Sequence, residues 1–395
     1  MRNSPRNICV FGHADLDGIV SAAIASAYLQ TKHPDAHQVV RPVDFHQRDT
    51  WKDFSRLVHE EPEHLDEFEL DQVPDGLAIV DFPATDWPSD RYLFFADHHQ
   101  DTYSTAADPA QVESEYLQRT GKGEPVFYDP SFPSCAELLV DALERRYGWR
   151  PPSWAEEAVQ DARVADTAGY ASVEDAIRRD PESVGLYDAM VQRMTPGQFE
   201  VAVLSISSGR LPAREAILAA APELVATVQQ EAEEAVRAYR ECARPAGESA
   251  RFIDLTDRTD PPIKRVRFAE FQGEQTQYAL QLLPISTQEG AAKVRGFIGR
   301  SPWTPGPPEG MSHPDSSRIA TDFAGGGGHD YAAGFLVTAP TYAQAQQQAR
   351  QIAQLMRPLL RPLPAGHPYA VRPTKEPSRE AHDPKPAPST SVPVR

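Results

Sequence analysis

Cysteine is scarce in this chain, and long hydrophobic runs are missing from it. The 395 residues include three cysteines, Cys9, Cys135 and Cys242, which lie far apart and form no Cys-x-x-Cys pair. The usual pattern of a zinc or redox site is therefore missing, and we interpret the three thiols as reduced core or helix residues. No apolar stretch is long enough for a signal peptide or a membrane span. We expect a cytoplasmic protein that makes no membrane contact.

Positive charge is also scarce. The 39 Lys and Arg residues are outnumbered by 57 Asp and Glu residues, which leaves a formal net charge of −18. Long nucleic acids are bound mainly by Lys and Arg side chains that displace counterions from the phosphates. The charge balance argues against a long basic channel, whereas a short substrate held by a few contacts is compatible with it.

Three apolar runs in the N-terminal part of the chain each stop at acidic or histidine residues. They are Ile8–Phe11, Leu77–Val80 and Tyr92–Ala96. Continuous apolar runs of this length are typical of parallel strands that are buried on both faces, and helical patterns between them complete a βαβ arrangement. We therefore predict an α/β fold whose parallel sheet gathers these polar residues at the carboxyl ends of its strands.

The first polar cluster has residue types that bind metal ions. His13, Asp15 and Asp17 alternate along the chain before Gly18. Alternate residues of an extended segment point the same way, so the three side chains can converge on one or two cations. Gly18 would allow a tight turn into a helix. The alternative is an acidic loop exposed to solvent.

The second polar cluster, Asp97-His98-His99, follows the third apolar run. A histidine that binds a metal ion commonly donates its other ring N–H to a carboxylate or a carbonyl. We therefore expect Asp97 to orient a ligating histidine rather than to bind a metal ion itself.

The rest of the chain contains helical patterns and a second group of strands. A helix from Arg214 to Cys242, bent or restarted at Pro222, would connect two domains. The predicted ranges are helices at 134–147, 154–166, 317–323 and 343–360 and strands at 251–255, 265–271, 278–283, 294–298 and 335–337. The expected division is a first domain at 1–213, a helical connector at 214–246, a smaller α+β domain at 247–360 and a disordered proline-rich tail at 361–395.

The order of the motifs resembles one known family. His-x-Asp-x-Asp-Gly, a lone Asp at a strand end, Asp-His-His, an Asp-Thr at a helix end and a four-glycine His motif follow one another along the chain. The series is similar to that of the DHH phosphoesterase superfamily. The last motif is similar to its DHH-associated substrate-binding domain, in the group of nanoRNases, cyclic-dinucleotide phosphodiesterases and RecJ-like enzymes.

The resemblance implies a set of metal ligands. One ion would be held by His13 and Asp15, and the other by Asp17, His98 and Asp166, with Asp81 bridging the two. The sequence around Asp166 only approximates the family pattern, and the alternative for this residue is a helix end without a ligand role. Phe82-Pro83 after Asp81 also departs from many relatives.

The resemblance also implies which residues contact the substrate. His99, Arg300 and His329 would stabilise the charge of the phosphate during catalysis, with Ser301 and the backbone of Gly326, Gly327 and Gly328 as further binding groups. The alternative for the four glycines is a flexible linker. Lys264, Arg265 and Arg267 lie on a predicted strand, and we interpret them as a solvated face.

The implied activity is hydrolysis of phosphodiester bonds with two divalent cations and an activated water. Manganese suits the mixed histidine and carboxylate ligands best, and magnesium is the alternative. We expect short RNA or DNA oligonucleotides and linear or cyclic dinucleotides as substrates, with nucleoside monophosphates as products. Two alternatives are a RecJ-like exonuclease specific for single-stranded DNA and a non-catalytic, nucleotide-binding regulatory module. The sequence is compatible with a homodimer.

Overall fold

The computed structural model describes residues 5–43, 70, 74–82, 92–99, 126–259, 266–273, 275–286, 292–328 and 330–371. The chain divides into two compact units. The first unit comprises Met1–Glu241 and Ile263–Gln272, and the second comprises Cys242–Pro262 and Gly273–Arg395. Each unit has a hydrophobic core of its own. Among the described helices, none has the length and apolar character that crossing a bilayer requires.

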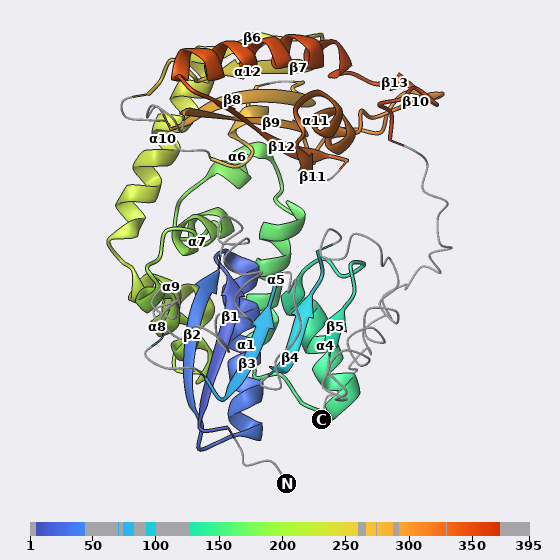
Figure 1. Ribbon diagram of the computed structural model, residues 1–395. Coiled ribbons are helices and arrows are strands. Elements are labelled where there is room, and N and C mark those ends of the chain that lie inside the picture. The colour runs from blue at the N-terminus through green and yellow to red at the C-terminus, as the bar shows by residue number, and fades with distance from the viewer. Residues whose placement is uncertain are drawn as a thin grey trace, which may run out of the picture. The chain divides into compact units, whose positions relative to one another are not determined.

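A five-stranded sheet, in which all neighbouring strands are parallel, forms the centre of the first unit (Figure 1). Its strands are β1 (Asn7–His13), β2 (His37–Val43), β3 (Gly76–Val80), β4 (Tyr92–Asp97) and β5 (Val126–Tyr128), in the order β2-β1-β3-β4-β5. Every residue of β3 is buried, as in a strand covered on both faces. The predicted parallel sheet is confirmed. The strand that follows β1 in the chain, β2, lies on one side of it, and the later strands lie on the other side. In sheets of this kind, ligands bind where the strand order changes in this way, here beyond the carboxyl ends of β1 and β3.

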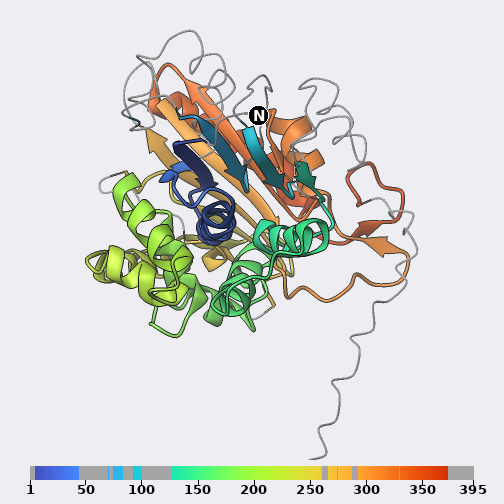
Figure 2. The same ribbon diagram turned by 90° about the horizontal axis from the view of Figure 1, so that it is seen from below.

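Several helices pack together beside this sheet. α1 (Leu16–Lys32) contacts α4 (Cys135–Tyr147), α5 (Ala155–Thr167) and α8 (Pro196–Ser207), and Figure 2 shows these helices gathered around α1. The remaining α-helices that the structure describes in this unit are α6 (Val173–Ile177), α7 (Val184–Val191), α9 (Ala213–Ala220) and α10 (Leu224–Cys242).

The turn from β1 into α1 depends on a glycine. The carboxylate of Asp15 caps α1 by accepting a hydrogen bond from the backbone N–H of Gly18 at 2.8 Å. A Cβ atom at Gly18 would lie only 2.0 Å from the carbonyl oxygen of His13. The chain therefore folds back so closely that no side chain fits at this position. His13, Asp15 and Asp17 are held together by this turn.

A six-stranded mixed sheet forms the second unit, with the order β11-β12-β9-β8-β7-β6. Only the β7–β8 pair is parallel. The strands are β6 (Ala243–Pro245), β7 (Ala250–Asp254), β8 (Tyr278–Ser286), β9 (Ala292–Arg300), β11 (Gly327–Gly328) and β12 (Ala332–Ala339). The helices α11 (Ser316–Ala324) and α12 (Tyr342–Met356) pack on it. The smaller α+β domain predicted after the helical connector is confirmed.

The segment predicted as a strand at 265–271 is different in the structure. Its described residues, 266–271, form a turn and a short 3-10 helix at Ala269–Phe271. Phe268 has a φ of 71°, which an extended strand does not contain. The segment belongs to the first unit, although the chain on either side of it belongs to the second. Arg267 is exposed, as predicted, but it does not lie on a strand face. Lys264 and Arg265 are outside the described residues.

The predicted disordered tail begins too early at residue 361. β13 (Leu363–Pro364) pairs with β10 (Met311–Ser312), and Ala370 forms a bridge with Pro314. Residues 363–370 are ordered because they pair with a distant segment of the chain, and a proline-rich composition does not reveal such pairing. Residues 372–395 of the predicted tail lie outside the described part of the chain.

Candidate metal centre

The structure brings all six predicted metal ligands to one place in the first unit. His13 ends β1, Asp15 and Asp17 lie at the start of α1, and Asp81 follows β3. His98 follows β4, and Asp166 lies in the last turn of α5. Parallel strands bring their carboxyl ends to one edge of the sheet, and this edge collects the side chains.

The ligand atoms of the described residues form three overlapping groups. One contains His13, Asp15 and Asp81, the second contains Asp17, His98 and Asp166, and the third contains Asp81, His98 and His99; within each group the ligand atoms lie within 4.8 Å of one another. Oδ2 of Asp81 lies 3.9 Å from Nδ1 of His13. Oδ1 of Asp81 lies 3.5 Å from Nε2 of His98. The two oxygens of one carboxylate thus face different groups.

Buried polar atoms without partners indicate that cations fit this site. Among the described residues, neither carboxylate oxygen of Asp81 nor Nε2 of His98 has a hydrogen-bond partner. The exposed fraction of Asp81 is 1%. A carboxylate that is buried without a partner is costly, whereas a bound cation satisfies it. The histidine and carboxylate donors fit divalent metal ions of borderline hardness.

The ring of His98 is oriented by a backbone carbonyl. Nδ1 of His98 lies 3.2 Å from the carbonyl oxygen of Phe132. A carbonyl only accepts hydrogen bonds, so Nδ1 carries a proton and Nε2 faces the carboxylates. Nε2 lies 3.6 Å from Oδ2 of Asp17 and 3.4 Å from Oδ2 of Asp166.

The carboxylate of Asp17 is held by the start of α4. Its Oδ2 accepts the backbone N–H of Cys135 at 2.6 Å, and its Oδ1 accepts that of Ala136 at 3.0 Å. The first N–H groups of a helix have no partner within the helix, and the helix dipole favours a negative group there. The rotamer of Asp17 is therefore fixed before any ion binds.

Asp97 orients His99 rather than His98. Oδ1 of Asp97, which is fully buried, accepts the Nδ1–H of His99 at 2.7 Å and its backbone N–H at 3.2 Å. Burial by itself would lower the pKa of His99, but Asp97, with Asp166 and Asp15 further away, raises it to about 9. Without bound ions, His99 is therefore a cation at neutral pH. A cationic donor suits the predicted role of His99 at a phosphate.

The clustered carboxylates repel one another. Burial and the charges of Asp17 and Asp15 raise the pKa of Asp81 well above its usual range. Burial also raises the pKa of Asp17, to about 6, although His98 opposes this shift. Burial would raise the pKa of Asp15 as well, but His13, whose Nδ1 lies 2.7 Å from Asp15, holds it below its usual range. Divalent cations would relieve this repulsion.

Arg267, which the sequence analysis assigned to a solvated face, contacts the helix end that carries Asp166. Arg267 donates from Nη1 to the carbonyl oxygen of Ala165 at 3.0 Å and from Nη2 to that of Asp166 at 3.4 Å. These carbonyls belong to the last turn of α5, where no intrahelical donor remains. No local pattern could reveal the contact, because the two partners are about a hundred residues apart.

The predicted substrate-binding residues belong to the second unit. Arg300 ends β9, and its side chain makes no hydrogen bond or ion pair with any residue that the structure describes. Ser301 is buried, and its Oγ lies 3.4 Å from the backbone N of Trp303. The strands β9 and β11 flank β12, which brings Arg300 and the glycine motif to the same end of the sheet.

The glycines of this motif have different surroundings. A Cβ atom at Gly326 would lie 2.2 Å from the carbonyl oxygen of Gly334, so close strand packing requires this glycine. A Cβ atom at Gly327 would meet nothing within 4 Å, which leaves its backbone open to an approaching group. Gly328 pairs with Ala333 in the sheet. His329 lies outside the described residues.

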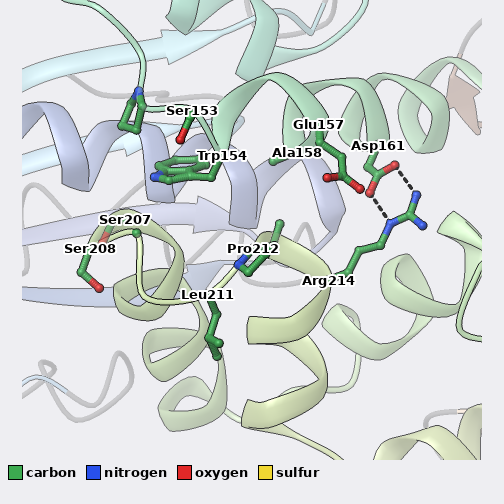
Figure 3. A pocket seen from close by; sticks show the side chains of 13 residues that line it. Ser153, Trp154, Glu157, Ala158, Asp161, Ser207, Ser208, Leu211, Pro212 and Arg214 are labelled. Atoms are coloured by element: carbon green, nitrogen blue, oxygen red, sulfur yellow. Dashed lines mark hydrogen bonds and ion pairs between the residues drawn. The ribbon is translucent and has the colours of Figure 1, made fainter.

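A separate hollow of about 560 Å³ lies in the first unit, and Figure 3 shows it. Trp154 and Pro212 line it, and the ion pair between Asp161 and Arg214 lies at one end, with Nε of Arg214 2.7 Å from Oδ2 of Asp161. None of the candidate metal ligands lines this hollow. It shares α5 with the metal centre but lies at the opposite end of that helix.

Comparison with solved structures identifies a protein domain of similar fold. No family model and no curated protein matches the chain. Among solved structures, the DHH domain of a member of a ribosomal-protein family matches with a TM-score of 0.53 and 14% identity, over 90% of this chain and 87% of that one. A pGpG-specific phosphodiesterase from Vibrio cholerae gives 0.47 and 12%, over 89% and 99%.

The manganese complex of RecJ from Thermus thermophilus gives a TM-score of 0.46 and 17% identity. This match covers 93% of the present chain but only 53% of the RecJ chain. The fold described above therefore has a solved counterpart in the DHH domain of the ribosomal-protein family member. The chain has the fold of the DHH-family proteins.

Proposed function

We propose that this chain is a two-metal phosphodiesterase that hydrolyses short nucleic-acid substrates. The observation that carries the proposal is the carboxylate of Asp81. Its two oxygens are buried, have no hydrogen-bond partner among the described residues, and face two different groups of ligand atoms. A carboxylate that bridges two ions is the simplest explanation of this arrangement.

The ligand assignment follows two of the three groups, and His99 of the third group is assigned to the substrate. His13 and Asp15 would bind one ion, Asp17, His98 and Asp166 would bind the other, and Asp81 would bridge them. Bound divalent ions supply Lewis-acid polarisation of a phosphoryl oxygen and a lowered pKa of water. Nitrogen and oxygen donors in one site favour manganese, with magnesium as the alternative.

The residues of the chain itself supply charge and orientation. Protonated His99, held by Asp97, offers a second ring N–H to a phosphate oxygen on which negative charge grows. Arg300 supplies a guanidinium group that forms no ion pair with any described residue. One guanidinium group can donate two parallel hydrogen bonds to the oxygens of a phosphate. The backbone of Gly327 is open to a further contact.

Short substrates fit the charge of the chain. A net charge of −18 does not favour an extended polyanion bound along a basic track. We therefore propose linear or cyclic dinucleotides and short oligonucleotides as substrates, and nucleoside monophosphates as products.

One panel of reactions tests the proposal. The full chain is incubated with Mn²⁺, Mg²⁺ or a chelator and with pApA, a cyclic dinucleotide or single strands of increasing length, and the products are separated. We expect monophosphates from the shortest substrates, and none with the chelator. Affinity that rises with strand length and falls steeply with salt would instead favour the exonuclease. Metal-loaded chain that binds dinucleotides without releasing a monophosphate would establish the regulatory alternative.

A further inference from the structure

A histidine outside every predicted motif, His313, is linked through Tyr278 to the strand end that carries Arg300. Tyr278 of β8 and Arg300 of β9 are direct cross-strand partners, so their side chains are on the same face of the sheet. The hydroxyl of Tyr278 lies 2.8 Å from Nδ1 of His313. Tyr278 thus connects His313 to the position of Arg300. His313 is also close enough to Arg300 for the guanidinium to lower its pKa.

The contact with Tyr278 fixes the tautomer of His313. Tyr278 is fully buried, and Nδ1 of His313 is the only partner of its hydroxyl in the described part of the chain. A buried O–H group without an acceptor is costly, so the hydroxyl donates and Nδ1 accepts. The proton of the neutral ring is therefore on Nε2. Burial raises the pKa of Tyr278 to about 12, which keeps this donor protonated.

His313 remains neutral for two reasons. Burial of its ring and the positive charge of Arg300 both lower its pKa, and the opposing charge of Asp330 does not reverse the shift. A neutral histidine with its proton on Nε2 donates one hydrogen bond without adding charge. The ring is partly exposed, so this N–H is accessible to a small group.

The ordered end of the chain holds the backbone of His313. The carbonyl oxygen of His313 accepts the N–H of Val371 at 2.9 Å, and the N–H of Asp315 donates to the carbonyl oxygen of Tyr369 at 2.8 Å. The β10–β13 pair lies just before this contact. His313 is therefore fixed from both sides, by Tyr278 at the ring and by residues 363–371 at the backbone.

The residues that follow the glycine motif contact both the strand end at Arg300 and the segment after His313. The N–H of Arg300 donates to the carbonyl oxygen of Tyr331 at 2.7 Å, and the N–H of Ser316 donates to that of Asp330 at 2.8 Å. Residues 330–331, which follow the glycine motif, therefore lie between Arg300 and the segment that carries His313. A cation, a neutral donor and an open glycine backbone are gathered at one end of the sheet.

We propose that His313 is a further substrate-binding residue, which donates a hydrogen bond from Nε2 to an oxygen of the phosphate group bound by Arg300. The proposal rests on the proposed function and specifies its substrate class. The second unit recognises a phosphate monoester or diester through one guanidinium and one neutral imidazole. Tyr278 and residues 363–371 are positioning groups for this imidazole.

Binding of AMP to the metal-free full chain, measured by calorimetry, tests the proposal without turnover. We expect His313→Ala to weaken AMP binding by about 10-fold, as for the loss of a hydrogen bond to a charged group. His313→Gln, whose amide N–H₂ reaches the place of Nε2, should recover part of the loss. Tyr278→Phe, which releases the tautomer, should cause a smaller loss in the same direction. Arg295→Met, an exposed change on β9, is the matched control.

Steady-state hydrolysis of pApA separates this proposal from the proposed function. His313→Ala should raise KM by about 10-fold and leave kcat unchanged, because the contact stabilises bound substrate and transition state equally. Unchanged AMP affinity in His313→Ala, or a parent chain that does not bind AMP, would overturn the role of His313. A chain that binds AMP through His313 but never hydrolyses pApA would contradict only the phosphodiesterase proposal.

Discussion

The candidate metal centre of the first unit and the proposed phosphate-binding end of the second unit, with Arg300 and His313, differ in charge. The first collects buried carboxylates such as Asp81, whose pKa is raised by burial and by the charges of Asp17 and Asp15. The second offers the guanidinium of Arg300, which no described residue neutralises, and the neutral ring of His313. One region is suited to cations and the other to an anion. Ion binding and substrate binding should therefore respond to different substitutions.

The largest expected effect is at Asp81. Asp81→Asn keeps the size of the side chain but removes the charge that two ions would share. We expect turnover of pApA with Mn²⁺ to fall by more than about 100-fold, because loss of even an outer partner of a metal ligand costs about 10- to 100-fold. The affinity for AMP should not change. The exposed substitution Asp35→Asn is the control, and an Asp81→Asn variant that retained both ions and full turnover would refute the bridging role.

Metal removal should affect the stability of the first unit. Each ion present at about 100 times its Kd stabilises the folded state by about 2.7 kcal/mol. For a domain of this size that corresponds to a rise in Tm of about 5–10 °C. Thermal unfolding with chelator and with Mn²⁺ measures the effect, and Asp81→Asn should reduce it. An equal Tm in both conditions would mean that the carboxylates do not hold ions.

Substitution of Arg300 should weaken substrate binding and leave metal binding unchanged. Arg300→Met is expected to raise the KM for pApA by about 10-fold or more, since hydrogen bonds to charged groups contribute about 1.5–3 kcal/mol. The number of Mn²⁺ ions bound should stay the same. Calorimetric titration with Mn²⁺ and steady-state kinetics together separate the two regions, with Arg295→Met as the control. Loss of a metal ion in Arg300→Met would show that the regions are not independent.

The smallest expected effect is at Arg267. Arg267→Met removes the donor to the carbonyls of Ala165 and Asp166 and leaves Asp166 less firmly placed. A single exposed hydrogen bond contributes about 1 kcal/mol, so we expect the weaker-bound Mn²⁺ to lose about 5-fold in affinity. The other ion and the fold should be unaffected. Arg210→Met, an exposed change in the same unit, is the control; equal affinities in both variants would show that Asp166 is held without Arg267.

The two regions also differ in how far the sequence predicted them. Most of the candidate metal centre could be predicted because its ligands lie at or just after the ends of apolar strands, as Asp81 follows β3, and parallel strands bring their ends together. Asp166, in the last turn of α5, was assigned only through the family resemblance. His13, Asp15 and Asp17 are moreover adjacent in the chain. The parallel sheet and the helix starting after Ser134 followed from equally local patterns.

What the sequence could not show depends on contacts between distant residues. The ring of His313 is oriented by Tyr278, and its backbone is held by Val371. No periodicity connects these positions. The strand predicted around Arg267 was wrong because alternation of basic and apolar residues also occurs in a turn, and the φ of 71° at Phe268 is not visible in residue types.

The backbone of Asp81 restricts what this position can accept. Its φ is 57°, in the left-handed region that most residues avoid but that aspartate, asparagine and glycine tolerate. Of these three only aspartate carries a charge. Glutamate would have to accept an unfavourable backbone and carry its carboxylate one carbon further. The residue types that position 81 accepts are therefore limited by backbone conformation and also by ligand chemistry. Aspartate alone meets both requirements.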